Sequence, residues 1–169
     1  MVIRQETPQD YAEVYQLVHS AFATAPHADG TEADYLNALR AKDTFVPELS
    51  LLAAENNRII GQIVLSEFTF LPPDESIASL LLSPLSVHPA FFRRGTASAL
   101  IKAGLAKAQK MGYTAVFLCG DPAFYHRFGF AATYRFGIYH TKDPRAEWCM
   151  AKEIENGVLR HAAGTIDIV

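Results

Sequence analysis

The chain has 169 residues, of which 50% are hydrophobic and 20% charged, and its formal net charge is -3. This length suits one domain with a full hydrophobic core, which we predict over residues 1–169. The negative charge argues against a nucleic-acid binder that relies on general electrostatics. No apolar run is long enough to span a bilayer, so no membrane partner is expected. The two cysteines and six histidines show no metal-ligand spacing, so we expect no metal and a reducing, cytoplasmic location.

The first forty residues predict a strand and two helices. Residues 2–6 form a short strand, and residues 7–10 carry a capping box with proline at the first helical position. A loop is expected at 23–30. Residues 31–34 repeat the capping pattern before a second helix.

The middle of the chain predicts a hairpin and a central strand. Strands at 49–55 and 59–70 flank the turn Asn56-Asn57, which is typical of a β-hairpin. A further apolar strand follows at 78–87. Pro84 interrupts it, and because proline cannot donate to a β-ladder, regular pairing should fail there.

Between the central strand and a helix that begins near residue 96 lies a small, basic turn. Glycine and alanine leave room for an anion at the helix N-terminus, where unpaired N–H groups and the helix dipole favour phosphate. An ordinary close-packed connection is the alternative. The turn is neither a Walker loop nor a GxGxxG fingerprint. Its residues are Arg93, Arg94, Gly95, Thr96, Ala97 and Ser98.

The last third predicts mostly strands. A strand at 114–119 precedes a short helix within 120–130, and further strands are expected at 134–138 and 147–154, with a last short one near the end.

Several segments, in this order, resemble the GNAT (Gcn5-related N-acetyltransferase) superfamily, and more specifically the YhbS-type predicted N-acetyltransferases. They are the turn, Pro-Leu-Ser-Val-His-Pro at 84–89, Gly-Asp-Pro-Ala-Phe-Tyr-His-Arg-Phe-Gly-Phe at 120–130, and the tail segments 157–159 and 164–166. The resemblance implies a mixed α/β fold, the acyl-CoA N-acyltransferase fold. In it, a mostly antiparallel sheet with splayed central parallel strands is flanked by helices. It also implies a transferase that moves an acetyl group from acetyl-CoA to an amine of a small molecule or a protein.

The resemblance implies a cofactor site on the central strand and the turn. The pantetheine arm of coenzyme A would pair with backbone at Leu85, Ser86 and Val87, and the pyrophosphate would lie on the N–H groups of residues 94–98. Phe92 departs from the Gln or Arg that is usual in the motif, and Arg93 stands where glycine is common. Arg93 or Arg94 is expected to supply the missing polar contact.

The resemblance also gives the acid, whereas the base stays open. Tyr125 matches the tyrosine that protonates the leaving thiolate, and a phenol with a pKa of about 10 holds its proton at pH 7. Glu67, His88 and Asp121 are candidate bases, and a water chain is the alternative. Each candidate has a plain structural reading: Asp121 as the cap before Pro122, His88 as the end of the strand, and Glu67 as a solvated side chain.

Three further alternatives remain from the sequence. A non-catalytic acyl-CoA-binding or sensing module would keep the cofactor site without turnover, and a domain for another nucleotide would prefer ATP or NAD. Cys119 is interpreted as a small buried residue rather than a covalent acetyl carrier, because no activating partner is evident. The acceptor is expected to contact residues 22–35 and 137–147, but its identity and a homodimer are both left open.

Overall fold

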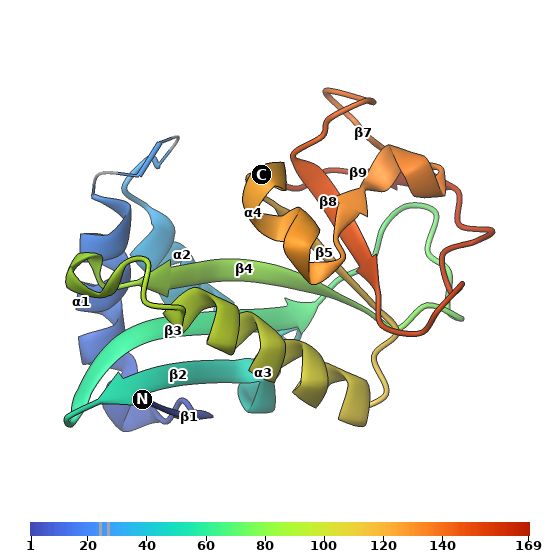
Figure 1. The fold of residues 1–169 in the computed structure, drawn as a ribbon. Helices are drawn as coiled ribbons and strands as arrows, with labels where there is room; N and C mark the ends of the chain where they lie inside the picture. The colour runs from blue at the N-terminus through green and yellow to red at the C-terminus, as the bar shows by residue number, and fades with distance from the viewer. Residues whose placement is uncertain (24, 27) are drawn as a thin grey trace. The chain divides into compact units, whose positions relative to one another are not determined.

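The computed structural model describes residues 1–23, 25–26 and 28–169, and Figure 1 traces them from the N-terminus in blue to the C-terminus in red. His27, in the predicted loop, lies outside the described residues. The chain divides into two compact units. The first comprises Met1–Ser66 and Ser83–Lys107, and the second comprises Glu67–Leu82 and Ala108–Val169. The single domain over 1–169 stays a prediction.

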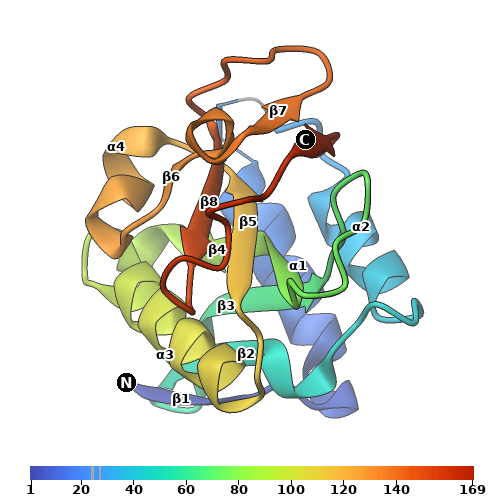
Figure 2. The same cartoon turned by 90° about the vertical axis from the view of Figure 1, so that its right-hand side faces the viewer.

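The first unit is a layer of four strands with helices on both faces. Hydrogen bonds join its strands in the order β1-β2-β3-β4, and β1, β2 and β3 pair antiparallel. Helices α1 and α2 cover one face and α3 covers the other (Figure 2). Strand β4 and helix α3 each continue into the second unit. The elements are β1 (Val2–Gln5), α1 (Tyr11–Phe22), α2 (Glu32–Leu39), β2 (Ser50–Glu55), β3 (Arg58–Glu67), β4 (Ser79–Val87) and α3 (Thr96–Lys110).

Apolar residues at helical spacing explain how α1 and α2 pack. Their apolar residues recur every three or four positions and are fully or almost fully buried. One face of each helix therefore packs against the strands. The predicted capping box is present, because Asp10 accepts hydrogen bonds from Thr7. The capping predicted at residues 31–34 is wrong, because the Thr31 hydroxyl donates to Asp29 and does not cap α2. The buried set is Val14, Leu17, Val18, Ala33, Leu36, Leu39, Leu52, Ile59 and Val64.

The hairpin turn is the one that the sequence predicts. Asn56 and Asn57 both have positive φ, 51° and 60°, as a two-residue type I′ turn requires. The strand after it ends at Glu67, not at Phe70 as predicted. The chain departs there because Leu71 exchanges backbone hydrogen bonds with Thr165 instead.

The second unit contains a mixed sheet and a small separate one. Its main strands have the order β4-β5-β8-β6. Residues 79–81 of β4 pair parallel with 115–117 of β5, and the other pairs are antiparallel. The two-stranded sheet β7-β9 is parallel. The elements are β5 (Ala115–Cys119), α4 (Pro122–Tyr125), β6 (Ala131–Ala132), β7 (Ile138–His140), β8 (Cys149–Glu153) and β9 (Gly164–Ile166).

The strand predicted at 134–138 is wrong. Thr133–Phe136 forms a 3₁₀ turn, which ends at Gly137 with φ 79°, and the strand β7 begins only at Ile138. A left-handed residue cannot continue a β-strand, so the ladder starts after it. The short strand expected near the C-terminus is confirmed as β9.

Aromatic rings form the centre of the second unit. Phe117 is fully buried, and its ring centroid lies 5.5 Å from that of Phe68 and 5.9 Å from that of Phe70. Within the described part of the chain, none of the helices combines the length and apolar character needed to cross a membrane.

Candidate cofactor and acyl-transfer site

The basic turn forms a geometric anion site at the start of α3. Gly95 has φ 83° and its carbonyl accepts the Ala99 N–H at 3.0 Å, so Gly95 caps the helix. The N–H groups of Thr96, Ala97 and Ser98 then stand in the first turn, where a helix has no partners for them. α3 is 15 residues long. Its N-terminus therefore presents donors and a partial positive charge to an anion.

The side chains of the turn differ in what they can contribute. Arg93 and Arg94 are exposed, and Arg93 holds φ 61° without being glycine, a left-handed conformation that costs about 1–2 kcal/mol. Thr96 is only 3% exposed, and its methyl group lies over Gly61. Phe92, which replaces the usual polar residue, is 51% exposed. The two arginines can therefore present positive charge to an anion, whereas Thr96 can present only its backbone N–H.

Sequence reasoning missed a third arginine beside the turn. The Arg58 guanidinium lies 5.8 Å from the centroid of the Phe91 ring, and that of Arg94 lies 5.2 Å from the same centroid. Arg58 begins β3, 35 positions before Arg93 in the chain (93 minus 58). Only the pairing of β3 with its neighbour could reveal this proximity. Three cations thus stand in or beside one turn, which suits a ligand with several phosphates.

His88 ends the central strand with both ring nitrogens engaged. Its Nδ1 accepts the Ala90 N–H at 3.2 Å, and its Nε2 lies 2.6 Å from an Arg58 nitrogen. Its backbone N–H donates to Ile60 at 2.8 Å. The ring therefore acts as a cap on the chain reversal after β4, and its role as a base stays a prediction.

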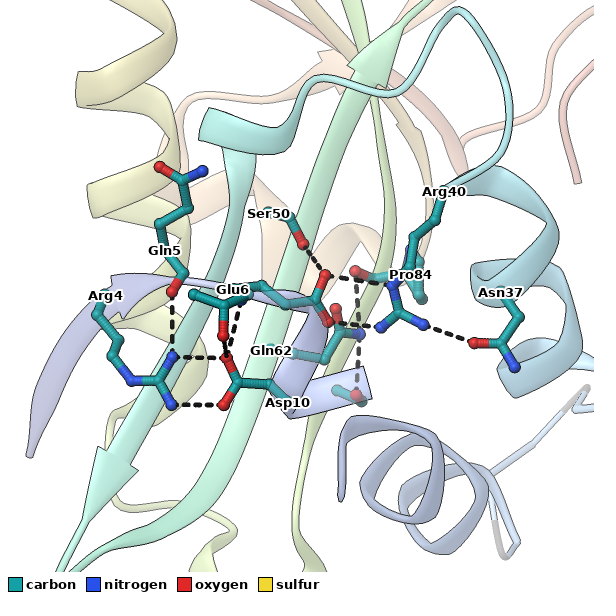
Figure 3. Close-up of polar contacts among 11 residues, drawn as sticks. Arg4, Gln5, Glu6, Asp10, Asn37, Arg40, Ser50, Gln62 and Pro84 are labelled. Atoms are coloured by element: carbon teal, nitrogen blue, oxygen red, sulfur yellow. Dashed lines mark hydrogen bonds and ion pairs between the residues drawn. The ribbon is translucent and has the colours of Figure 1, made fainter. Parts of the chain in front are cut away.

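A buried glutamine contacts the segment of β4 where the three predicted cofactor residues lie. The Gln62 amide donates to the Pro84 carbonyl at 3.3 Å and to the Ser86 hydroxyl at 3.0 Å (Figure 3). Pro84 has no N–H to donate to a β-ladder, and the Gln62 side chain satisfies its carbonyl oxygen instead. Ser86 is 4% exposed and Val87 is buried, whereas Leu85 is half-buried, and their pairing with coenzyme A stays a prediction. A lone amide in an apolar strand was the signal that sequence analysis overlooked.

Tyr125 lies in the second unit on a short helix. Asp121 accepts the Ala123 N–H at 2.9 Å, so it is the helix cap, with Pro122 at the first helical position. The Tyr125 ring packs on Gly120 and makes edge contacts with Phe124 and Phe130. Burial raises the pKa of Tyr125 to about 12, so the phenol keeps its proton at neutral pH.

Glu67 is also in the second unit, at the exposed end of β3. It accepts the Tyr113 hydroxyl at 2.9 Å. The Glu67 carboxylate is thus exposed and already accepts one hydrogen bond. These contacts do not single out an amine partner, so its role as a base stays a prediction.

A pocket lies in the predicted acceptor loop of the first unit. Its volume is about 290 Å³. Two acidic residues line it, but Asp29 accepts from Thr31 and Glu32 accepts from Asp29, so both also hold the loop together. The lining consists of His19, Phe22, Ala23, Ala25, Ala28, Asp29, Gly30 and Glu32. Within residues 1–23, 25–26 and 28–169, no three His, Cys, Asp or Glu side chains gather as metal ligands would.

The chain is similar to acetyltransferases in sequence. Residues 2–133 match the family model of the GNAT acetyltransferase domain. The uncharacterized N-acetyltransferase YhbS of Escherichia coli K12 is 33% identical over 152 residues, 88% of this chain and 80% of that protein. YjhQ of the same strain is 33% identical over 99 residues, so the chain spans only 55% of that relative. Serotonin N-acetyltransferase of Mesocricetus auratus is 32% identical over 75% of this chain and 65% of that protein.

Solved structures agree with this. A GNAT acetyltransferase from Brucella melitensis in complex with acetyl-CoA has a TM-score of 0.72 and 34% identity, covering 78% of this chain and 82% of that one. YhbS from Escherichia coli in complex with CoA has a TM-score of 0.85 at 24% identity, covering 99% of this chain and 89% of that one.

The fold is the acyl-CoA N-acyltransferase fold, in which helices flank a mixed sheet that contains a parallel strand pair. The chain belongs to the GNAT acetyltransferase family, whose members use acetyl-CoA as the acetyl donor to an amine. The predicted family, fold class and enzyme class are therefore confirmed.

Proposed function

We propose that the protein transfers an acetyl group directly from acetyl-CoA to an amine, with the turn 93–98 holding the pyrophosphate. The single observation that carries this assignment is the Gly95 cap, which exposes the first N–H groups of a 15-residue helix next to three arginines. The phosphates of coenzyme A need such donors and charges. The pantetheine amides would pair with the backbone of Leu85, Ser86 and Val87.

Three events make up the proposed reaction. A neutral amine attacks the thioester carbonyl, charge develops on the carbonyl oxygen, and the C–S bond then breaks to release a thiolate. Tyr125 gives its proton to that thiolate, and the raised pKa keeps this proton available. The amine proton leaves through Glu67, His88 or water. The contacts of His88 favour the other two routes, because both of its ring nitrogens already have partners.

Gly120 supports Tyr125 in this proposal, which gives a test. A Cβ at Gly120 would lie 2.8 Å from Tyr125 Cδ2 and closer still to Cε2. Gly120→Ala should therefore displace the ring and lower kcat by about 10²-fold, the cost of misplacing a reacting group by about 1 Å. The measurement is steady-state release of the coenzyme A thiol.

A double mutant separates this effect from a general loss of fold. In a Tyr125→Phe background the phenol is already absent, so adding Gly120→Ala should cost little further activity. An equally large loss in both backgrounds would remove the supporting role of Gly120.

The acceptor is proposed to be a small molecule or a protein amino group that contacts residues 22–35 and 137–147. The pocket beside Asp29 and Glu32 supports this for the first of these loops, because carboxylates attract an ammonium group before it loses its proton. A cytoplasmic location belongs to the same proposal, since Cys119 and Cys149 are both free thiols. A homodimer stays a prediction that light scattering can check.

Thermal unfolding with acetyl-CoA, coenzyme A, ATP and NAD tests the proposal. A ligand that binds only the native state should stabilise it by about 2.7 kcal/mol at 100 times its Kd. We expect acetyl-CoA and coenzyme A to raise the Tm and the other two nucleotides not to. Amines, polyamines, amino acids and peptides are then screened for thiol release.

The two possible failures have different meanings. An unchanged Tm at millimolar acetyl-CoA would mean that the cofactor site has been lost, with Phe92 and Arg93 as the departures from the motif. A clear shift without turnover on any amine would instead indicate an acyl-CoA-binding module without catalysis.

A further inference from the structure

The two cysteines of the chain face each other across the main sheet of the second unit. Cys119 in β5 and Cys149 in β8 are register partners in an antiparallel pair. These two strands lie side by side in Figures 1 and 2. Partners in such a ladder point to the same face of the sheet, so both thiols lie on one side.

The ladder also determines which kind of pair they form. The next pair is hydrogen bonded, since Gly120 donates to the Trp148 carbonyl at 2.9 Å. Hydrogen-bonded and non-hydrogen-bonded pairs alternate along an antiparallel ladder, so Cys119 and Cys149 form a non-hydrogen-bonded pair. Their Cα atoms are then expected about 4.5 Å apart, at the short end of the range of about 4.4–6.8 Å that disulfides span.

Their surroundings favour a thiolate on this pair. The Thr133 hydroxyl donates to Cys149 Sγ at 3.5 Å. A hydrogen bond from Cys119 lowers the pKa of Cys149 to about 7, with Thr133 and His140 acting in the same direction. The same contact, together with burial, raises the pKa of Cys119. The lowered pKa of Cys149 supports a thiolate within the pair.

The two cysteine residues differ in exposure. Cys149 is completely buried, whereas Cys119 is partly exposed at the end of β5. A small oxidant therefore reaches Cys119 first, because Cys149 is buried. Cys149 is then placed to resolve the product.

We infer that Cys119 and Cys149 form a redox-active dithiol that a peroxide oxidises reversibly to a cross-strand disulfide. The Cys119 sulfur gives up its thiol proton and attacks one oxygen of hydrogen peroxide. An S–O bond forms, the O–O bond breaks, and the hydroxide released takes a proton to become water. Cys149 thiolate next attacks the Cys119 sulfur, forming the S–S bond and displacing the second hydroxide as water. Two thiols and one peroxide give one disulfide and two waters, and an added dithiol reverses the change.

This modification lies beside the proposed acid. Cys119 immediately precedes Gly120, on which the Tyr125 ring packs. The inference about the thiols does not depend on the proposed function, however, and its test needs no acetyl transfer.

The test treats the folded, fully reduced protein with hydrogen peroxide at pH 7, removes the peroxide with catalase and blocks remaining thiols in denaturant. Trypsin places the two cysteines in separate peptides, 111–127 and 146–152. We expect these peptides to be linked within one chain, and dithiothreitol to separate them. Oxidation of Met111 or Met150 changes peptide mass but cannot create the link. The inference would be overturned if both cysteines were recovered as separate alkylated thiols or as sulfinic acids. A disulfide that forms only between two chains would overturn it as well.

Two variants test the order of events. Cys149→Ser should leave a sulfenic acid on Cys119 that dimedone captures. Cys119→Ser should make Cys149 react at least about 10-fold more slowly, because it is buried. Equal reactivity of the two single variants, each checked for native circular dichroism, would contradict the assigned roles.

Discussion

Tyr125→Phe is expected to lower kcat for acetyl transfer by about 10²–10⁴-fold, the usual contribution of a positioned acid. Phenylalanine keeps the ring contacts with Gly120, Phe124 and Phe130 and removes only the hydroxyl. Stabilisation by acetyl-CoA should therefore stay near the native value. The paired measurements are thiol release at saturating acetyl-CoA and the Tm shift with the same ligand.

A second tyrosine provides the matched control. The Tyr11 ring on α1 lies 4.0 Å from the Arg40 guanidinium in the first unit, and Tyr11→Phe, which keeps this ring, should leave turnover unchanged. Burial raises the pKa of Tyr125 to about 12. At every pH under about 11 the phenol therefore keeps its proton, and its titration should not lower the rate of acetyl transfer. Native turnover in Tyr125→Phe would mean that another group, or water, protonates the thiolate.

Arg40→Ala is expected to produce the largest loss of stability, about 3–5 kcal/mol, because it leaves a carboxylate buried without its partner. The Glu6 and Arg40 side chains are 1% and 5% exposed (Figure 3). Glu6 also accepts the Ser50 hydroxyl at 2.7 Å. The Arg40 guanidinium stacks 4.0 Å from the centroid of the Tyr11 ring. Urea unfolding measures the change in the free energy of unfolding.

A neighbouring ion pair on the surface serves as the comparison. Arg4 bonds Asp10 at 2.7 Å, but its side chain is 43% exposed. Arg4→Ala should therefore cost no more than about 1 kcal/mol. Similar losses for Arg4→Ala and Arg40→Ala would show that the burial of Glu6 does not determine the cost.

Local signals in the sequence were sufficient where the structure depends on near neighbours. The Asn56-Asn57 turn, the Thr7–Asp10 capping box and the Asp121 cap all act within three residues, so the chain itself carries the information. The anion turn is of the same kind, because one glycine and the start of one helix define it.

Distant contacts explain what sequence analysis missed. Arg40 meets Glu6 across 34 positions, and Gln62 meets Pro84 across 22, so neither pair leaves a local pattern. The strand expected at 134–138 failed for a different reason. Its apolar and aromatic residues suit a strand, but a 3₁₀ turn forms there and ends at Gly137, whose φ of 79° does not belong to a strand.

The order of the segments along the chain has a consequence for synthesis on the ribosome. The first unit has all its residues once Lys107 has emerged. Residues 67–82 are made before that point, yet they belong with residues made after it. Leu71 in particular has no partner until Thr165 is made, 94 positions later (165 minus 71). At that point the apolar side chains of Phe70 and Ile77 still lack the buried residues that they pack against in the complete structure. This interval is when the nascent chain most needs protection from aggregation.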